Sequence, residues 1–379
     1  MSEYVRLEDV CEILDSQRVP ITASERVAGI YPYYGANGIQ DYVDKYIFDD
    51  ELVLLAEDGG NFGSKDRPIA YRVSGKCWVN NHAHVLRPNK EIDVDYLCYS
   101  LMFYDTCGLV NGATRQKLTQ SAMRQMKIPF VSKEKQKEIV LKLNLATALI
   151  YKHKKQLEKL DELVKARFVE MFGDVTNNDK NWHIEPLGNL CDISRGGSPR
   201  PIEQYLGGTI PWIKIGDATD GDDIYLTKTK EKILEIGIKK SRLVKSGSLI
   251  FANCGVSLGF ARIITFDGCI HDGWLSFENI DENLDKIFLL KSLNCMTEYF
   301  RSIAPSGTQP NLNTAIMKSY KQIVPPIELQ NQFADFVKQV EKTKTEVQKS
   351  LEQAETLKKA LMQKYFGKVN VYAMHKRHL

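Results

Sequence analysis

The sequence lacks the features of several classes of protein. It contains no stretch of about 18 consecutive apolar residues, and its first residues contain no apolar core of a signal peptide. We therefore expect a soluble, cytoplasmic chain with no membrane partner. Its eight cysteines are scattered and form no Cys-x-x-Cys pair, which argues against a zinc site and against a disulfide framework.

Motifs for three kinds of catalysis are also absent or incomplete. The phosphate-binding pattern Gly-x-x-x-x-Gly-Lys-Ser/Thr does not occur, and neither does the Asn/Asp-Pro-Pro-aromatic motif of adenine methyltransferases. Gly255-Val-Ser-Leu-Gly259 resembles the nucleophile turn of a hydrolase, but Phe260–Thr265 has the pattern of a strand where that turn requires a helix. We expect no enzymatic activity and no cofactor.

The composition is that of an ordinary folded protein. Hydrophobic residues make up 43% of the 379 residues and charged residues 26%, which is enough to build normal cores. The length predicts two domains with connecting structure. The net charge of +3 is too small to indicate a nucleic-acid partner, because that inference depends on clustering of basic residues on a surface.

The chain repeats itself, which is the most informative feature of the sequence. Gly112–Leu118 is echoed by Ser306–Leu312, with Thr114 matching Thr308. The opening segment recurs as well, and further matches follow along the chain: Leu7–Ile13 with Leu187–Ile193, Ala122-Met123 with Ile316-Met317, Pro129 and Gln136 with Pro325 and Gln332 after a small insertion, and Phe172-Gly173 with Phe366-Gly367. The bodies between these segments are unlike, so the pattern indicates one task performed on two different targets.

The order of predicted elements favours an α+β fold. Each copy has a strand-rich mixed domain, with Val53–Ala56 and Ser248–Ala252 as candidate buried strands, and each domain precedes a long helix. We predict the following boundaries: a first domain at 1–130, a first helix at 131–174, a linker at 175–182, a second domain at 183–326, a second helix at 327–368 and a tail at 369–379.

Both helices carry an apolar stripe with alternating spacings of three and four residues, which is typical of a coiled coil. Such a stripe cannot be buried by its own helix, so we expect the two helices to pack against each other, antiparallel and related by a pseudo-twofold axis. The alternative is that each helix docks separately on its own domain. The predicted seam consists of Ile139, Leu143, Ala146, Ile150, Leu157, Leu160 and Val164 in the first helix and Phe333, Phe336, Val340, Val347, Ala354, Leu357 and Leu361 in the second.

The two bodies carry the remaining pattern. The first contains Tyr33-Tyr-Gly-Ala-Asn-Gly-Ile-Gln40 followed by Ala56-Glu-Asp-Gly59, and the second contains Gly207-Gly-Thr-Ile-Pro-Trp-Ile213. Together with the duplicated order, they resemble the target-recognition domains of the specificity subunit of type I restriction-modification systems, over nearly the whole chain. The resemblance implies a non-catalytic DNA-binding subunit that reads a split site on double-stranded DNA. It also implies a helical spacer that docks modification (methyltransferase) subunits, with restriction (motor and endonuclease) subunits completing the complex.

Side chains that read base edges are chiefly Arg, Lys, Asn and Gln on loops that enter a groove. The first domain offers such groups around its Gly/Thr loop and in two other loops, and the second domain offers a comparable set. The candidate DNA-binding residues are Lys65, Arg67, Asn80, Asn81, His82, Arg115, Gln116 and Lys117 in the first domain and Arg195, Arg200, Lys214, Asn253, Arg262, His271, Gln309 and Asn311 in the second.

These residues also have simpler interpretations. The Gly/Thr loops are equally consistent with turns that cap the following helix, and Lys65 and Arg67 with ordinary solvated charge. His82 and His84 could ligate a metal, but no third ligand lies at an expected spacing, so we predict no metal site. We expect Tyr33, Tyr34, Trp212 and Trp274 in the core. A scaffold that binds proteins through its helices and does not bind DNA is the main alternative function.

Overall fold

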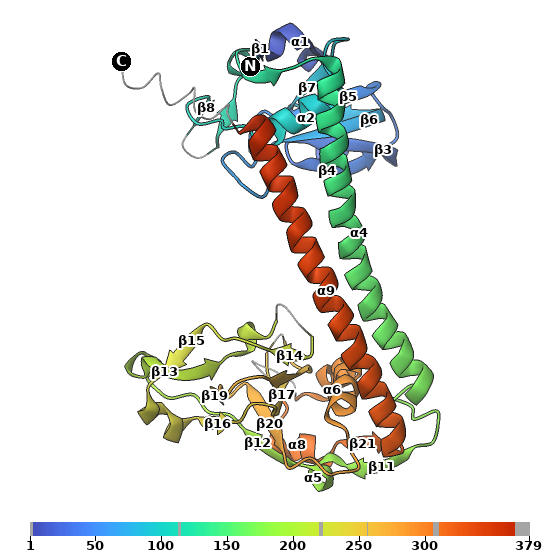
Figure 1. Cartoon of the computed structure of the whole chain (residues 1–379), viewed down its shortest axis with the longest axis vertical. Helices are drawn as coiled ribbons and strands as arrows, with labels where there is room; N and C mark the ends of the chain where they lie inside the picture. Colours follow the sequence, from blue (N-terminus) through green and yellow to red (C-terminus); the bar gives the residue numbers. More distant parts are fainter. Residues whose placement is uncertain (1–2, 113–114, 220–222, 256, 306–310, 368–379) are drawn as a thin grey trace. The chain divides into compact units, whose positions relative to one another are not determined.

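The computed structural model describes residues 3–112, 115–219, 223–255, 257–305 and 311–367 (Figure 1). The chain divides into two compact units. The first unit comprises residues 1–155 together with 348–379, and the second comprises residues 156–347. Two helices of 40 residues, α4 (Lys133–Phe172) and α9 (Ile327–Phe366), run through both units.

A six-stranded mixed sheet forms the centre of the first unit. Its strand order is β2 (Cys11–Ile13), β7 (Ala83–Pro88), β5 (Phe48–Ala56), β6 (Ala70–Val79), β3 (Ala28–Gly35) and β4 (Gly38–Val43). Strand β5 is buried on both faces, which explains its continuous apolar run from Leu52 to Ala56. Val53 and Leu55 pack toward α2 (Val94–Met102), whereas Leu52 and Leu54 join a core on the opposite face.

The second unit contains two sheets. One has the order β12 (Asp192–Arg195), β20 (Trp274–Glu278), β17 (Leu249–Ala252), β18 (Ala261–Ile264) and β14 (Tyr225–Leu226). The other has the order β15 (Glu231–Ile233), β13 (Leu206–Ile213), β19 (Gly268–Ile270) and β16 (Arg242–Val244). The helices α6 (Lys286–Cys295) and α7 (Thr297–Ile303) contribute to its main core. The predicted buried strands are therefore present in β5 and β17, and the segment after Gly259 is strand β18.

The same pair of antiparallel strands and the same short helices accompany the sheets of each unit as a frame. In the first copy β1 (Glu3–Arg6) pairs antiparallel with β10 (Lys127–Phe130), and in the second β11 (His183–Pro186) pairs with β21 (Lys321–Val324). Short helices complete the frame, namely α1 (Leu7–Val10) and α3 (Gln120–Arg124) in one copy and α5 (Leu187–Leu190) and α8 (Thr314–Ser319) in the other. A two-stranded ribbon of β8 (Val110–Asn111) and β9 (Lys117–Leu118) occurs in the first unit.

One predicted match within the repeat is wrong. Strands β10 and β21 and helices α4 and α9 begin 194 residues apart in the two copies, so no insertion separates them. At that offset Gln136 corresponds to Gln330, and both side chains are fully buried. Gln332 is exposed on α9. The sequence match of Gln136 with Gln332 followed the prolines Pro129 and Pro325, which do not occupy equivalent places.

The two long helices pack side by side in antiparallel orientation (Figure 1). In the first unit the start of α4, including Ile139 and Leu143, packs with Phe366 at the end of α9. In the second unit the end of α4, including Phe168, packs with Phe333 near the start of α9. Ion pairs flank the apolar contacts in each unit, with Lys154 and Glu355 at 3.2 Å and Asp161 and Lys344 at 2.9 Å.

The seam of α4 follows the predicted stripe. Ile139, Leu143, Ala146 and Val164 are buried, and Ile150, Leu157 and Leu160 are half-buried.

The seam of α9 follows the prediction except at Leu357. Phe333, Val340, Val347 and Ala354 are buried and Leu361 is half-buried, but Leu357 is 50% exposed. Val337 and Leu351 are also buried, and Phe336, Lys344 and Lys358 are half-buried. Lysine contributes its long aliphatic stem to such a seam, which a search for apolar residues overlooks.

Candidate nucleic-acid interface

Three loops of the first unit converge at the carboxyl end of β5. They supply Asp58 after β5, His82 between β6 and β7, and Arg115 before β9. His82 Nδ1 lies 2.6 Å from Asp58 Oδ1, and the Arg115 guanidinium lies 2.9 Å from the same oxygen and 3.2 Å from His82 Nδ1. The Arg115 side chain is 59% exposed, so a ligand in solvent can reach it.

The surrounding main chain holds these loops in place. Gly59 N–H donates to Gln116 O at 3.3 Å, and the Asn37 amide donates to Gly59 O at 3.0 Å. Gly59 has a φ of +60° and Arg115 lies 3.5 Å from the position of a Cβ there, so glycine permits this close approach. Asn80 accepts the N–H of His82 at 2.8 Å and donates to Gln40 at 3.1 Å. Through these hydrogen bonds Asn80 supports the loop. Because its side chain is buried, it does not fit the predicted role as a direct DNA contact.

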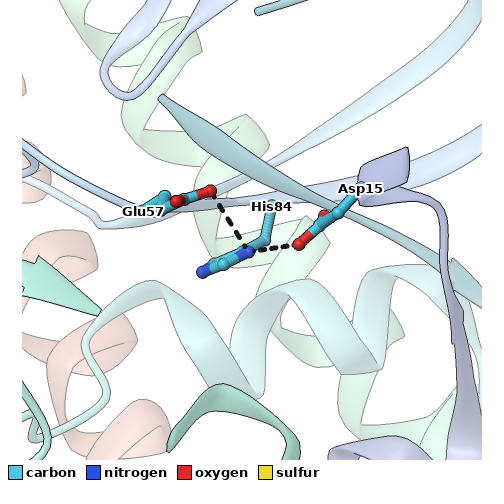
Figure 2. Close-up of side chains that lie close together, drawn as sticks. All are labelled: Asp15, Glu57 and His84. Carbon is cyan, nitrogen blue, oxygen red and sulfur yellow. Dashed lines mark hydrogen bonds and ion pairs between the residues drawn. The ribbon is translucent and has the colours of Figure 1, made fainter. Parts of the chain in front are cut away.

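A charged cluster is formed by Asp15, Glu57 and His84, of which Glu57 directly precedes Asp58 (Figure 2). The fully buried His84 ring has Asp15 on one side, with Nδ1 and Oδ2 2.6 Å apart, and Glu57 on the other, with Nδ1 and Oε2 3.7 Å apart. Arg18 donates to Glu57 Oε2 at 2.6 Å, and Lys117 Nζ lies 3.0 Å from Glu57 Oε1. The cluster therefore joins β7 and the end of β5 to the loop that carries Arg115.

The carboxyls in this cluster are held in their charged form. Burial raises the pKa of Asp15, but the hydrogen bond and charge of His84, the Val85 N–H and Gln120 outweigh it, so the pKa lies below its ordinary value. Burial likewise raises the pKa of Glu57, and hydrogen bonds from Arg18 and Lys117 more than compensate.

Asp15, Glu57 and His84 are close enough to form a three-ligand metal site, since their ligand atoms lie within 4.8 Å of one another. The hydrogen bonds do not favour that use. Both Asp15 oxygens already accept hydrogen bonds, and Arg18 and Lys117 neutralise Glu57. A cation would have to displace two protein cations, so the cluster is better described as an ion network.

The second unit presents a different polar group in the corresponding loops. His271 and Asp272 lie between β19 and β20, with His271 Nδ1 2.9 Å from Asp272 Oδ1. Arg195 donates to Asp272 O at 2.9 Å, and Ser198 donates to Asp272 Oδ1 at 2.7 Å. The His271 ring lies 5.5 Å from the buried Trp212 ring.

Positive charge surrounds His271. Burial lowers the pKa of His271, and the nearby cations Arg200, Lys214 and Arg195 lower it further, whereas Asp272 raises it; the net shift is downward. Lys214 is ion-paired with Glu231. Four of the predicted residues, Arg195, Arg200, Lys214 and His271, are thus close enough to influence one another.

Asn253 does not fit its predicted role as a direct DNA contact. It is fully buried at the end of β17, and its amide donates to Asn311 Oδ1 and to Leu312 O, each at 3.1 Å. Asn311 is half-buried beside it and forms an isolated β-bridge with Cys254. Gln309 lies outside the described residues.

The remaining predicted residues are dispersed. Lys65, Arg67 and Asn81 are exposed on loops, and Gln116 is exposed beside Arg115. Arg262 is half-buried, donates to Ala261 O at 2.8 Å and stacks on Phe260 at 4.7 Å, so its environment is structural.

The search for cationic and amide side chains missed two groups. The first is the acidic partners Asp15, Glu57 and Asp58, which share no local motif. The second is a set of exposed lysines on and around β15 and β16, for which the clustering of lysines in the sequence was an available signal. These lysines are Lys228, Lys230, Lys232, Lys239, Lys240 and Lys245.

Comparison with known proteins identifies the class of molecule. Residues 2–162 and 179–356 match the model of the type I restriction modification DNA specificity domain. The chain therefore belongs to this family and contains two copies of the domain. Specificity subunits are the components that give a type I system its DNA target specificity, and they are not its catalytic components.

Curated relatives agree with this assignment. The chain is 28% identical over 351 residues to a putative type I restriction enzyme specificity subunit of Haemophilus influenzae, covering 89% of this chain and 87% of the relative. It is 23% identical over 405 residues to the MjaVIII specificity subunit of Methanocaldococcus jannaschii, covering 97% and 93%.

Solved structures share the fold. The type I restriction-modification S subunit of M. genitalium matches with a TM-score of 0.62 at 15% identity, covering 97% of this chain and 96% of that one. A chain from a study of complex assembly and conformational transition of the type I R-M system matches with a TM-score of 0.58 at 17% identity, covering 96% and 97%. Among the described residues, no helix is both long enough and apolar enough to cross a membrane.

Proposed function

We propose that this chain reads a bipartite sequence on double-stranded DNA, one block with each unit, and directs partner methyltransferase and endonuclease subunits to that site. The observation that carries the proposal is that an equivalent main-chain hydrogen bond holds the corresponding loop in both units, while the polar side chains around it differ. Leu118 N–H donates to Glu57 O at 2.7 Å in the first unit, and Leu312 N–H donates to Asn253 O at 2.8 Å in the second. In the first unit the segment Arg115–Leu118 held this way lies beside His82, whereas in the second the segment Asn311–Leu312 lies beside the buried Asn253.

The chemistry of each surface suits a DNA groove. An arginine such as Arg115 presents two parallel donors that match guanine. Exposed lysines, such as Lys65 in the first unit and Lys230 in the second, can contact phosphates. In the absence of DNA, Asp58 and His82 hold the Arg115 guanidinium in one position, which limits the side-chain entropy lost on binding.

A surface for a partner subunit is available on α4. Leu141, Leu145 and Leu149 recur every four residues and are 60%, 57% and 45% exposed. Such a stripe outside the seam is an apolar helix face of the kind that accepts another helix. We propose that the methyltransferase subunit packs there.

Two measurements test this function. The chain mixed with its methyltransferase partner should methylate two short blocks separated by unread bases, whereas neither protein alone should do so. Binding of the chain to duplex DNA should also weaken steeply as salt increases, because phosphate contacts release counterions. If the chain binds the methyltransferase partner but shows no salt-dependent binding to DNA, the result would support the alternative function, a scaffold that binds proteins and not DNA.

The α4 face has its own control. Leu145→Glu should abolish co-purification with the methyltransferase subunit while leaving DNA binding by the chain intact. Gln332→Glu, at an exposed position on α9, adds the same single negative charge and should preserve the complex. Loss of the complex in both variants, or in neither, would contradict docking on this face.

A further inference from the structure

The two loop exits, Arg115–Leu118 and Asn311–Leu312, are anchored by equivalent main-chain bonds but capped by different side chains. In the first unit, His84 Nε2 lies 2.9 Å from the carbonyl oxygen of Leu118. In the second, the amide of Asn253 donates to the carbonyl oxygen of Leu312 at 3.1 Å. The equivalent oxygen is therefore served by an ionisable ring in one unit and by a neutral amide in the other.

The contacts of His84 define its protonation. A carbonyl oxygen can only accept a hydrogen bond, so Nε2 must carry a hydrogen. The other nitrogen, Nδ1, faces Asp15 Oδ2 at 2.6 Å, and both oxygens of that carboxyl accept further hydrogen bonds, Oδ1 from the Val85 N–H and Oδ2 from the Gln120 amide. A carboxylate also only accepts, so Nδ1 carries a hydrogen as well. The geometry is that of an imidazolium buried beneath the loop.

The groups around the ring balance this charge. Asp15 comes from the turn after β2, and Glu57 follows β5 with its carboxylate 3.7 Å from Nδ1. Arg18, from the same turn, lies 3.6 Å from Asp15 and 2.6 Å from Glu57, and Lys117 pairs with Glu57 from the loop exit itself. Lys117 and Leu118 are consecutive, so the network holds the loop exit at two adjacent points.

Among the described residues of the second unit, no ion network occupies the corresponding point. Strand pairing places Ala56 opposite Ala83 and Leu55 opposite His84, and it places Ala252 opposite Trp274 and Phe251 opposite Leu275. Leu275 therefore stands where His84 stands in the first unit, and it is fully buried in an apolar core.

We propose that Asp15 and His84 are positioning residues for the first recognition surface, and that the buried imidazolium fixes the loop exit from which Arg115 and Gln116 reach DNA. The inference rests on the proposed function. It adds that sequence discrimination by the first unit depends on an ion pair that touches no DNA, whereas discrimination by the second unit depends on the neutral Asn253.

Selection from a randomised duplex DNA library tests this with the full chain and three variants. His84→Leu, which copies Leu275, should lower the preference for the cognate bases of one block roughly tenfold and leave the other block unchanged. Asn253→Leu should do the reverse. Asp15→Asn, a milder change that keeps an acceptor for Nδ1, should affect the same block as His84→Leu to a smaller degree. Misfolding of the whole chain would not give this reciprocal pattern.

A spectroscopic measurement tests the premise without DNA. The chain has seven histidines, so ¹⁵N-histidine labelling with His84→Leu as the assignment reference isolates the signal of His84. Two ring nitrogens that each donate a hydrogen bond are expected, and a ring in which either nitrogen lacks a hydrogen would overturn the inference. So would unchanged selection by His84→Leu, or equal loss in both blocks. If the unmodified chain selected no sequence at all, the proposed function would fail, and the inference with it.

Discussion

Gln136 and Gln330 make the same three hydrogen bonds, one residue in each half of the chain. Gln136 accepts the Asp93 N–H at 2.7 Å and donates to Glu91 O and Val131 O. Gln330 accepts the Asp285 N–H at 2.8 Å and donates to Asn283 O and Pro325 O. Each buried amide thus fastens the start of a long helix to the loop before α2 or α6.

We expect Gln136→Met to lower the free energy of unfolding by about 1–3 kcal/mol, because the change leaves the Asp93 N–H and two carbonyl oxygens without their partner. Gln330→Met should behave similarly. Gln332→Met is the control, since Gln332 is exposed and should tolerate the change within about 0.5 kcal/mol. Urea unfolding followed by circular dichroism measures all three. Equal effects of Gln136→Met and Gln332→Met would contradict the structural equivalence.

The position of the seam on α9 can be tested with two leucines. Leu351 is 6% exposed and Leu357 is 50% exposed. Leu351→Ala should therefore destabilise the chain by about 2–5 kcal/mol, because it leaves a cavity between the helices. Leu357→Ala should cost less than about 0.5 kcal/mol. Thermal unfolding of both variants under the same conditions gives the comparison, and the reverse order would restore the seam predicted from the sequence.

Arg115 and Gln116 should discriminate bases in one block only. Replacing both with Ala should reduce the preference for the cognate sequence in that block by about 1–3 kcal/mol for each lost bidentate contact. Lys65→Ala with Arg67→Ala is the comparison, because these exposed residues are expected to contact phosphates. That pair should weaken binding to specific and random duplexes equally and reduce the dependence of affinity on salt. Equal loss on random DNA for the Arg115 variant would assign Arg115 to phosphate as well.

DNA binding by the second unit should depend on pH through His271. Its pKa is below the ordinary value near 6.5, since burial and the nearby cations disfavour the charged ring. A DNA phosphate placed among these cations would raise that pKa, so binding would take up a proton. Affinity should therefore increase as pH falls from about 8 to about 6, and His271→Gln should remove most of the increase. Fluorescence anisotropy with a labelled duplex gives both profiles; a parallel response of the variant would show that another group titrates.

Lengthening both helices should change the spacing between the blocks. Since α4 and α9 each run through both units, one heptad must be added to each, between Lys155 and Gln156 and between Val347 and Gln348. Seven residues add about 10 Å, which corresponds to roughly three base pairs. Methylation mapping with the partner should show both blocks unchanged and a longer unread stretch. A heptad added to α4 alone should disrupt the seam instead, and an unchanged spacer in the double insertion would contradict the idea that the helices set the distance.

The long helices and the repeat could be predicted from the sequence because both are local or periodic signals. Alternating apolar positions such as Ile139, Leu143 and Ala146 identify a helix face without knowledge of its partner. The layers of α9 were harder to predict, since Lys344 and Lys358 are half-buried while Leu357 is exposed. A lysine in a seam looks like a surface residue in the sequence.

The site could be predicted only in part. The sequence singles out Arg115, Gln116 and His82 because exposed cations and amides on loops are what base reading requires, and the structure brings Arg115 and His82 together; their contact with DNA stays a prediction. Their support was not identified, since Asp15 follows β2 and His84 lies in β7, and these residues come together only because the two distant strands pair in the sheet. Asn80 and Asn253 show the opposite error, because an amide that caps a main-chain carbonyl or amide has the same sequence signature as one that reads a base.

The exchange of helix ends between the units also constrains how the chain folds as it is synthesised. The core of the first unit includes Phe366, which packs on Tyr96 at 5.3 Å between ring centroids and follows Tyr96 by most of the chain's length. A ribosome therefore releases the sheet of the first unit long before the helix turn that closes its core. The second unit receives Phe172 from the earlier helix and can complete its own aromatic cluster with Phe288 and Phe333 sooner. Although the first unit is synthesised first, we expect it to finish folding last. A chain truncated before α9 would leave the apolar core of the first unit without Phe366.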